Sequence, residues 1–247
     1  MMKYALGALL AAGVALSAYR AKALTRSGAA AAFGVGTAVF GAAGWPGAAV
    51  LFAFFLPSAL LSRRGTQTRN GWQVLANGGV AALCALAAAR GGAALSAGFA
   101  GAFAAASADT WGTEIGIRWG RTPVSILTFR PVAVGRSGGI TVVGSLATLG
   151  GAFLVAAAAA LVHIAPLRAV VLGGIAGALL DSIVGASLQA LRWCPVCESE
   201  CETRRHDCGE PTVMRQGCSW IENDAVNSAA TLCGAVVAAS AFLLGDS

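Results

Sequence analysis

The chain has 247 residues, of which 57% are hydrophobic and 11% are charged, and its mean hydropathy is +0.71. About a quarter of the residues of a soluble domain are charged, so this composition excludes a soluble globular protein and predicts an all-α integral membrane protein. The net charge of +6 does not indicate a nucleic-acid partner, because the basic residues are scattered between apolar runs and form no continuous stripe.

The apolar runs predict about eight short transmembrane helices, with a range of about six to nine, in a single polytopic domain over residues 1–247. They are rich in Ala and Gly, which let membrane helices approach closely. Two short runs, 46–61 and 92–106, are either re-entrant or continue into the polar residues that follow them. The runs are 4–19, 28–43, 46–61, 74–89, 92–106, 140–162, 169–191 and 222–244.

The first run ends in Tyr19-Arg20-Ala21-Lys22-Ala23, which partly resembles the end of a cleaved signal peptide. Its basic residues follow the apolar run, which favours a retained first helix with the N-terminus outside. Most of the 17 lysines and arginines lie in segments 20–27, 62–73, 107–139 and 192–221. The positive-inside rule therefore predicts that these four segments are cytoplasmic and that both termini are outside.

Five carboxylates lie at or near the predicted cytoplasmic ends of spans, where an ionised group needs a partner or a metal. They are Asp109, Glu114, Asp181, Glu222 and Asp224. Asp109 and Glu114 are five apart and would not share a face of an unbroken helix. Gly112 and Gly116 are therefore predicted to break the helix and let both carboxylates reach one hard cation such as Mg²⁺. The alternative is a helix cap followed by a polar turn.

Small and polar residues recur every fourth position from Gly173 to Gln189, with Asp181 among them. This spacing predicts a close-packed helix face with Asp181 and Gln189 aimed inward, or else a packing face with one locally satisfied Asp. Two further polar sets begin spans, and either binds a ligand or merely caps a helix. They are Asn70, Gln73 and Asn77 before one span, and Asn223, Asp224 and Asn227 before another.

A glycine-rich turn, Gly135-Arg136-Ser137-Gly138-Gly139, immediately precedes a span. Its backbone N–H groups and the following helix N-terminus can bind a phosphate, with Arg136 adding charge-assisted hydrogen bonds, although many such turns are only turns. Arg118 and Arg121 are near in sequence. No Walker-type motif exists, because Lys3 and Lys22 are the only lysines.

A cluster of Cys and His residues occupies a small hydrophilic insert, residues 192–221. Its spacing favours a structural zinc site made of Cys194, Cys197, His206 and Cys208, with Cys201 and Cys218 unassigned. Disulfides are the competing interpretation, but a cytoplasmic loop normally keeps its thiols reduced.

Several of these motifs occur together and in order in one known family. They are Ala108-Asp109-Thr110-Trp111 with Glu114-Ile115-Gly116, Gly135 to Gly139, Leu180-Asp181-Ser182 with Gly185-Ala186 and Gln189, and Asn223-Asp224-Ala225-Val226-Asn227. In these motifs the chain resembles the transmembrane protein 19 family, also known as domain of unknown function 92, whose plant members are phytyl-phosphate kinases. The resemblance implies a membrane kinase that converts an isoprenyl (phytyl or polyprenyl) monophosphate to the diphosphate, with CTP or ATP as donor.

We therefore expect a Mg²⁺-dependent site built from Asp109, Glu114, Asp181 and Asp224 at the cytoplasmic face of the membrane. The residues expected to bind substrate or phosphate are Asn77, Arg118, Arg121, Gly135, Arg136, Ser137, Gly138, Gly139, Gln189, Asn223 and Asn227. Other readings remain open. They are a cytidylyltransferase or another lipid phosphotransferase, a small-solute transporter, and a scaffold whose Cys-rich loop binds a partner.

Overall fold

The computed structural model describes residues 2–62 and 68–245, in which the chain forms seven α-helices and five short strands. Six of the helices, all but α4, are long and apolar enough to cross a membrane. This confirms the predicted all-α membrane fold. The helices are α1 Met2–Arg20, α2 Arg26–Ser62, α3 Gly71–Ala88, α4 Ala93–Trp119, α5 Val142–Leu161, α6 Leu167–Ser187 and α7 Asn223–Gly245.

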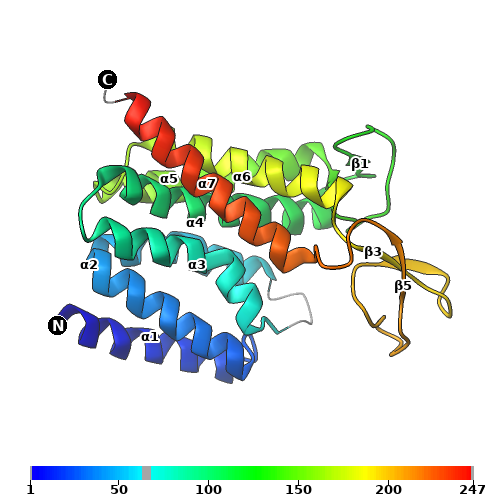
Figure 1. The fold of residues 1–247 in the computed structure, drawn as a ribbon, viewed down its shortest axis with the longest axis horizontal. Coiled ribbons are helices and arrows are strands. Elements are labelled where there is room, and N and C mark those ends of the chain that lie inside the picture. The colour runs from blue at the N-terminus through cyan, green and yellow to red at the C-terminus, as the bar shows by residue number, and fades with distance from the viewer. Residues whose placement is uncertain (1, 63–67, 246–247) are drawn as a thin grey trace.

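Helix α2 is folded back on itself. A straight helix of 37 residues would be about 55 Å long, yet both of its ends lie beside Arg69. The backbone N–H of Thr25 donates to the Arg69 carbonyl at 3.0 Å, and the Arg69 guanidinium donates to Ser62 Oγ at 2.8 Å. The reversal occurs at Gly44, whose φ of 60° and ψ of −148° are not helical. The predicted runs 28–43 and 46–61 are thus the two arms of α2 (Figure 1).

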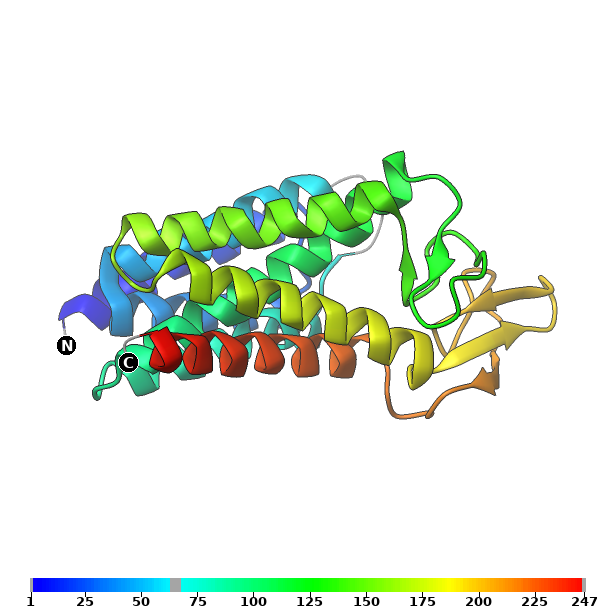
Figure 2. The same ribbon diagram turned by 90° about the horizontal axis from the view of Figure 1, so that it is seen from above.

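Helix α4 lies at the centre of the bundle and contacts α2, α3, α5, α6 and α7 (Figure 2). Residues 97–108 are all buried. Their small side chains allow this crowding, because Ala and Gly let neighbouring backbones come close. The short run 92–106 is therefore not re-entrant, and its helix continues through the polar residues to Trp119.

The prediction that Gly112 and Gly116 break this helix is wrong. Both lie within α4, where they make room for α5. A Cβ on Gly112 would lie 2.3 Å from Thr148 Oγ1, and one on Gly116 would lie 3.2 Å from Thr141 Oγ1. The glycines therefore serve close helix packing.

The predicted small-residue face of residues 173–189 is a true packing face. A Cβ on Gly177 would lie 2.4 Å from Ala105 Cβ in α4 and 2.6 Å from the Ala230 carbonyl in α7. One on Gly173 would lie 2.4 Å from the Gly234 carbonyl. Helices α4, α6 and α7 therefore meet at nearly bare backbone, as membrane helices do when van der Waals contact holds them together.

The strands lie in two loops. Strands β1 (Val124–Ser125) and β2 (Gly139–Ile140) pair in the loop between α4 and α5. The Cys-rich insert between α6 and α7 forms an antiparallel sheet in the order β4-β3-β5. Its strands are β3 Leu191–Cys194, β4 Ser199–Cys201 and β5 Val213–Gln216. The run predicted as 169–191 accordingly ends as a helix at Ser187, and its last residues enter the sheet.

We call one end of the bundle the basic end, defined by segments 20–27, 68–73, 120–141 and 188–222, which lie at the right-hand ends of the helices in Figure 1. Residues 63–67 of the predicted basic segment lie outside the described residues. The beginning of α1 and the end of α7 lie at the other end (Figure 1), where Arg168 donates to the Gly245 carbonyl at 2.8 Å. The predicted basic segments thus share one end, and their cytoplasmic location stays a prediction.

Candidate functional site

A cavity of about 310 Å³ opens at the basic end between α4, α5, α6, the glycine-rich turn and the beginnings of α3 and α7. It gathers most of the predicted site residues. The predicted residues that line it are Asn77, Asp109, Glu114, Arg121, Gly135, Arg136, Ser137, Gly138, Gly139, Asp181, Asn223 and Asn227. Their catalytic and binding roles remain predictions, but the fold brings them together from five regions of the sequence.

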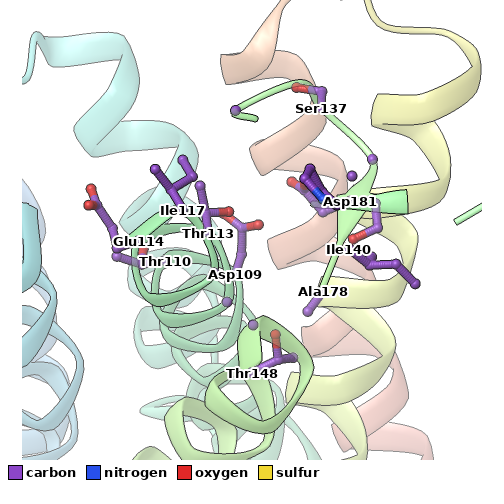
Figure 3. Close-up of a pocket in the computed structure, with 18 of the residues that line it drawn as sticks. Asp109, Thr110, Thr113, Glu114, Ile117, Ser137, Ile140, Thr148, Ala178 and Asp181 are labelled. Carbon is purple, nitrogen blue, oxygen red and sulfur yellow. The ribbon is translucent and has the colours of Figure 1, made fainter. Parts of the chain in front are cut away.

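Two carboxylates face each other across this cavity, Asp109 from α4 and Asp181 from α6 (Figure 3). Their positions follow from the helix packing. Gly177 contacts Ala105, and each Asp lies four residues further toward the basic end on its own helix. A step of four residues returns to the same helix face, so the tight contact of small residues brings the carboxylates together one turn above it.

The Asp109 and Asp181 carboxylates fit a hard cation. Asp181 Oδ2 is buried and, within the described residues, has no hydrogen-bond partner. Two like charges so near each other repel unless a proton or a cation lies between them. Oxygen donors are the ligands that Mg²⁺ prefers, and it usually takes only one or two carboxylates beside substrate phosphates. These residues can therefore hold Mg²⁺.

Glu114 lines the cavity on another side of α4 and is already paired. Its Oε2 accepts a hydrogen bond from Arg118 at 3.0 Å, and the Arg118 guanidinium also donates to the Leu61 carbonyl. Arg118 itself does not line the cavity. Arg69 does line the cavity; burial lowers the pKa of its guanidinium, and the Glu114 and Asp109 carboxylates raise it. An arginine remains charged under such opposing influences.

The glycine-rich turn does line the cavity, but a carboxylate occupies its donor groups. Gly135 and Gly138 have positive φ angles of 84° and 74°, which glycine adopts without strain. The backbone N–H of Ser137 donates to Glu202 Oε1 at 2.9 Å. Ser137 thus binds a carboxylate of the Cys-rich insert, and phosphate binding by the turn stays a prediction.

Two further predicted residues lie outside the cavity lining. Gln189 donates from Nε2 to Glu202 Oε2 at 2.7 Å and so supports the insert. Asp224 sits in the first turn of α7, where a negative charge favours the helix dipole. Its neighbours Asn223 and Asn227 do line the cavity.

Sequence reasoning missed several polar residues that line the cavity. They are Arg69, Thr110, Thr113, Thr141, Ser145, Thr148, Ser182 and Glu202. Gln73, which the sequence groups with Asn70 and Asn77 in one polar set, also lines the cavity. Arg69 directly precedes that set, and this position is the signal in the sequence that could have found it. Glu202 carried no signal, because it is one of several acids among the cysteines.

The four predicted zinc ligands come together in the insert. One donor atom each from Cys194, Cys197, His206 and Cys208 lies within 4.8 Å of all the others. The Sγ atoms of Cys194 and Cys208 are 3.7 Å apart, and two sulfurs bound about 2.3 Å from a tetrahedral zinc would lie at about that separation. All seven cysteines are free in the structure. The cluster can therefore hold a metal ion.

The position of the His206 ring in the cluster fits a bound cation. His206 Nδ1 lies 3.3 Å from Cys208 Sγ, while its Nε2 lies 3.4 Å from Ser199 Oγ. A metal-binding histidine usually has its second ring nitrogen held in this way. A hydrogen bond to Cys208, loss of solvation and the adjacent Cys194 together raise the pKa of Cys197 to about 11. A bound cation reverses such a shift by stabilising the thiolate.

With this geometry established, comparison with known proteins gives the family. The family described as "Integral membrane protein DUF92" matches residues 9–235. The chain belongs to this family. No solved structure matches the chain.

Three curated proteins are similar to this chain. Protein PGR of Arabidopsis thaliana is 32% identical over 87% of this chain and 87% of its own length. An uncharacterized membrane protein of Methanocaldococcus jannaschii is 36% identical over 56% of this chain and 63% of its own length. An uncharacterized membrane protein of Synechocystis is 27% identical over 88% of this chain and 82% of its own length. The family membership confirms the resemblance found in the motifs.

Proposed function

We propose that this protein is a membrane-bound, Mg²⁺-dependent kinase that converts an isoprenyl monophosphate, such as phytyl or polyprenyl phosphate, to the diphosphate with CTP or ATP. The observation that supports it most is the pair Asp109 and Asp181 at one cavity that Arg69, Arg121 and Arg136 also line. Phosphoryl transfer depends on positioning and charge stabilisation more than on covalent chemistry. Carboxylates for a metal and arginines for phosphates meet that need.

The chemistry requires no general base. A phosphate monoester has a second pKa of about 6, so its oxyanion can attack the donor phosphorus directly. No histidine lines the cavity within the part of the chain that the structure describes. Asp109 and Asp181 would hold Mg²⁺, which when bound offsets the negative charge of the phosphates. Arg121 and Arg136, which also line the cavity, suit the phosphates of the nucleotide.

The acceptor must reach the cavity from the lipid. Apolar residues Ile117, Ile140 and Ala178 lie among the polar lining residues. Residues Val142 and Leu146 near the beginning of α5 are 79% and 64% exposed, as expected for a helix face in contact with lipid. We place the isoprenyl tail on this side, with its phosphate toward Asp109 and Asp181. The basic end would face the cytoplasm, where nucleotides are available, and the metal of the Cys-rich insert would be a structural zinc.

An assay with purified protein in detergent tests this function. The protein is incubated with Mg²⁺, labelled CTP or ATP, and phytyl, geranylgeranyl or farnesyl monophosphate, and the products are identified. The proposal expects an isoprenyl diphosphate and a nucleoside diphosphate, both lost on chelation of Mg²⁺. A CDP-lipid with pyrophosphate would instead identify a nucleotidyltransferase. If a folded preparation gave no lipid product with either donor, a transporter or a scaffold would replace the kinase proposal.

A further inference from the structure

Glu202 connects three parts of the molecule. Its two carboxylate oxygens accept hydrogen bonds from the backbone N–H of Ser137 at 2.9 Å, from Ser137 Oγ at 2.9 Å and from Gln189 Nε2 at 2.7 Å. Ser137 belongs to the glycine-rich turn, and Gln189 lies just beyond α6. Charge-assisted hydrogen bonds of this kind are stronger than neutral ones. Glu202 therefore holds the turn to the end of α6.

A second set of contacts joins the same turn to the same insert. The Arg136 guanidinium lies 3.4 Å from Glu200 Oε2 and 3.4 Å from Gln216 Oε1. Glu200 belongs to β4 and Gln216 to β5, and Arg215 also pairs with Glu200 at 3.4 Å. The insert thus fixes the two side chains of the turn that are best suited to bind a phosphate.

The insert has little apolar core of its own. All four residues of β5 are exposed, whereas Cys194 at the end of β3 is fully buried among the other donors of the cluster. Small units without a sufficient core commonly depend on a metal for their fold. Glu202 lies in the chain between β4 and His206. On one side, Ser199 of β4 pairs with the metal-ligand candidate Cys194, and on the other side His206 is itself a ligand candidate, so both sides of Glu202 are held by the cluster.

We propose that Glu202 is a positioning residue through which metal binding by the Cys-rich insert fixes the glycine-rich turn at the cavity. The inference rests on the proposed function only in taking this turn as the phosphate-binding element. Glu202 is not a metal or substrate ligand in this account, because its oxygens are already engaged by protein donors. Loss of the metal would release Glu202 and, with it, Ser137 and Arg136.

Hydrogen–deuterium exchange of the full-length protein in detergent tests this coupling directly. Glu202→Gln keeps the shape of the side chain but removes the charge that accepts the three hydrogen bonds. We expect amide exchange within 134–139 to rise about tenfold, since a lost net hydrogen bond to a charged group corresponds to roughly that factor. Bound zinc should be unchanged. Removing zinc from the wild type should raise amide exchange of residues 134–139 by a similar factor. Removing zinc from Glu202→Gln should raise it little further.

Glu210→Gln is the matched control, since Glu210 is an exposed carboxylate of the same insert, and it should leave exchange in the turn unchanged. Exchange of the buried residues 97–108 reports whether the bundle stays folded. The inference would be overturned if the turn exchanged as slowly in Glu202→Gln as in the wild type, or if removing zinc left exchange in the turn unchanged. The result is read without substrate, so it stands even if no kinase activity is found. If activity is found, Glu202→Gln should change KM for a phosphate substrate more than it changes kcat.

Discussion

At the scale of single residues, the candidate site contains two carboxylates inside the helix bundle of a membrane protein, Asp109 in α4 and Asp181 in α6. An ionisable group there is unfavourable without a partner, so such residues usually serve a function. Asp109 and Asp181 are placed by the contact of Ala105 with Gly177 one turn below them, and Asp181 Oδ2 has no partner within the described residues. The same two helices therefore carry the residues that pack, Ala105 and Gly177, and, one turn further on, the carboxylates at the cavity.

Asp181→Asn tests the role of this pair. The amide preserves volume and packing but is a poor ligand for Mg²⁺, so turnover should fall at least about 100-fold while the protein stays folded. Glu210→Gln, which removes a charge from the exposed insert, should keep wild-type turnover. Two quantities are measured for each variant: the rate of diphosphate formation and the thermal unfolding temperature. Wild-type turnover in Asp181→Asn would remove this residue from the site.

The metal cluster gives a second prediction at this scale. Purified protein should contain about one zinc per chain, and Cys194→Ser should lose most of it because a structural site needs all four ligands. Cys233→Ser is the control, since Cys233 lies in α7 and outside the donor cluster. Elemental analysis gives the metal content. Equal zinc in Cys194→Ser and Cys233→Ser would show that the cluster does not bind it.

At the scale of elements, apolar runs predict the helices well because the bilayer demands long apolar segments. The fold of α2 was recoverable, since its two runs flank Gly44, which alone takes the non-helical conformation. The course of α4 was not. Gly112 and Gly116 look like helix breakers in the sequence, but they lie against Thr148 and Thr141 of α5. Whether a glycine ends a helix or allows another helix to pack closely depends on which helix lies beside it, and the local sequence does not specify that helix.

Helix packing yields its own prediction. Gly177→Leu would force a side chain into the contact with Ala105 and Ala230 and should destabilise the protein by about 1–3 kcal/mol, the usual effect of overpacking. Gly34→Leu is the control, because a Cβ there meets nothing within 4 Å. Thermal unfolding in detergent compares the two. Equal unfolding temperatures would contradict the proposed tight junction of α4, α6 and α7.

At the scale of the whole molecule, the ordered motifs predicted which residues gather at the cavity, because each lies where a span meets the basic end. Residues that act across loops escaped prediction. Glu202 reaches Ser137 from 65 positions away, and nothing in the spacing of the insert distinguishes it from Glu198 or Glu200. Gln189, expected at the cavity, instead supports Glu202. Long-range pairing of exposed polar residues leaves no periodic signal in the sequence.

The sidedness of the molecule can be tested by cysteine labelling. Thr128→Cys lies in an exposed loop of the basic end and His163→Cys in an exposed loop at the other end. In a background without native cysteines, a membrane-impermeant maleimide should label His163→Cys in intact cells and Thr128→Cys only after permeabilisation, because the basic segments should be cytoplasmic. Labelling of Thr128→Cys in intact cells would show that the basic end faces the outside.

The central claim is that Asp109 and Asp181 together hold the divalent cation of the reaction. Mn²⁺ takes the same oxygen ligands as Mg²⁺ and can be followed by electron paramagnetic resonance. In the presence of nucleotide, the wild type should bind Mn²⁺ at least about tenfold more tightly than Asp109→Asn or Asp181→Asn, the loss expected on removing one charged ligand. Glu210→Gln, which removes an exposed carboxylate that does not line the cavity, should still bind Mn²⁺ through both aspartates. Unchanged Mn²⁺ affinity in both aspartate variants would contradict the account.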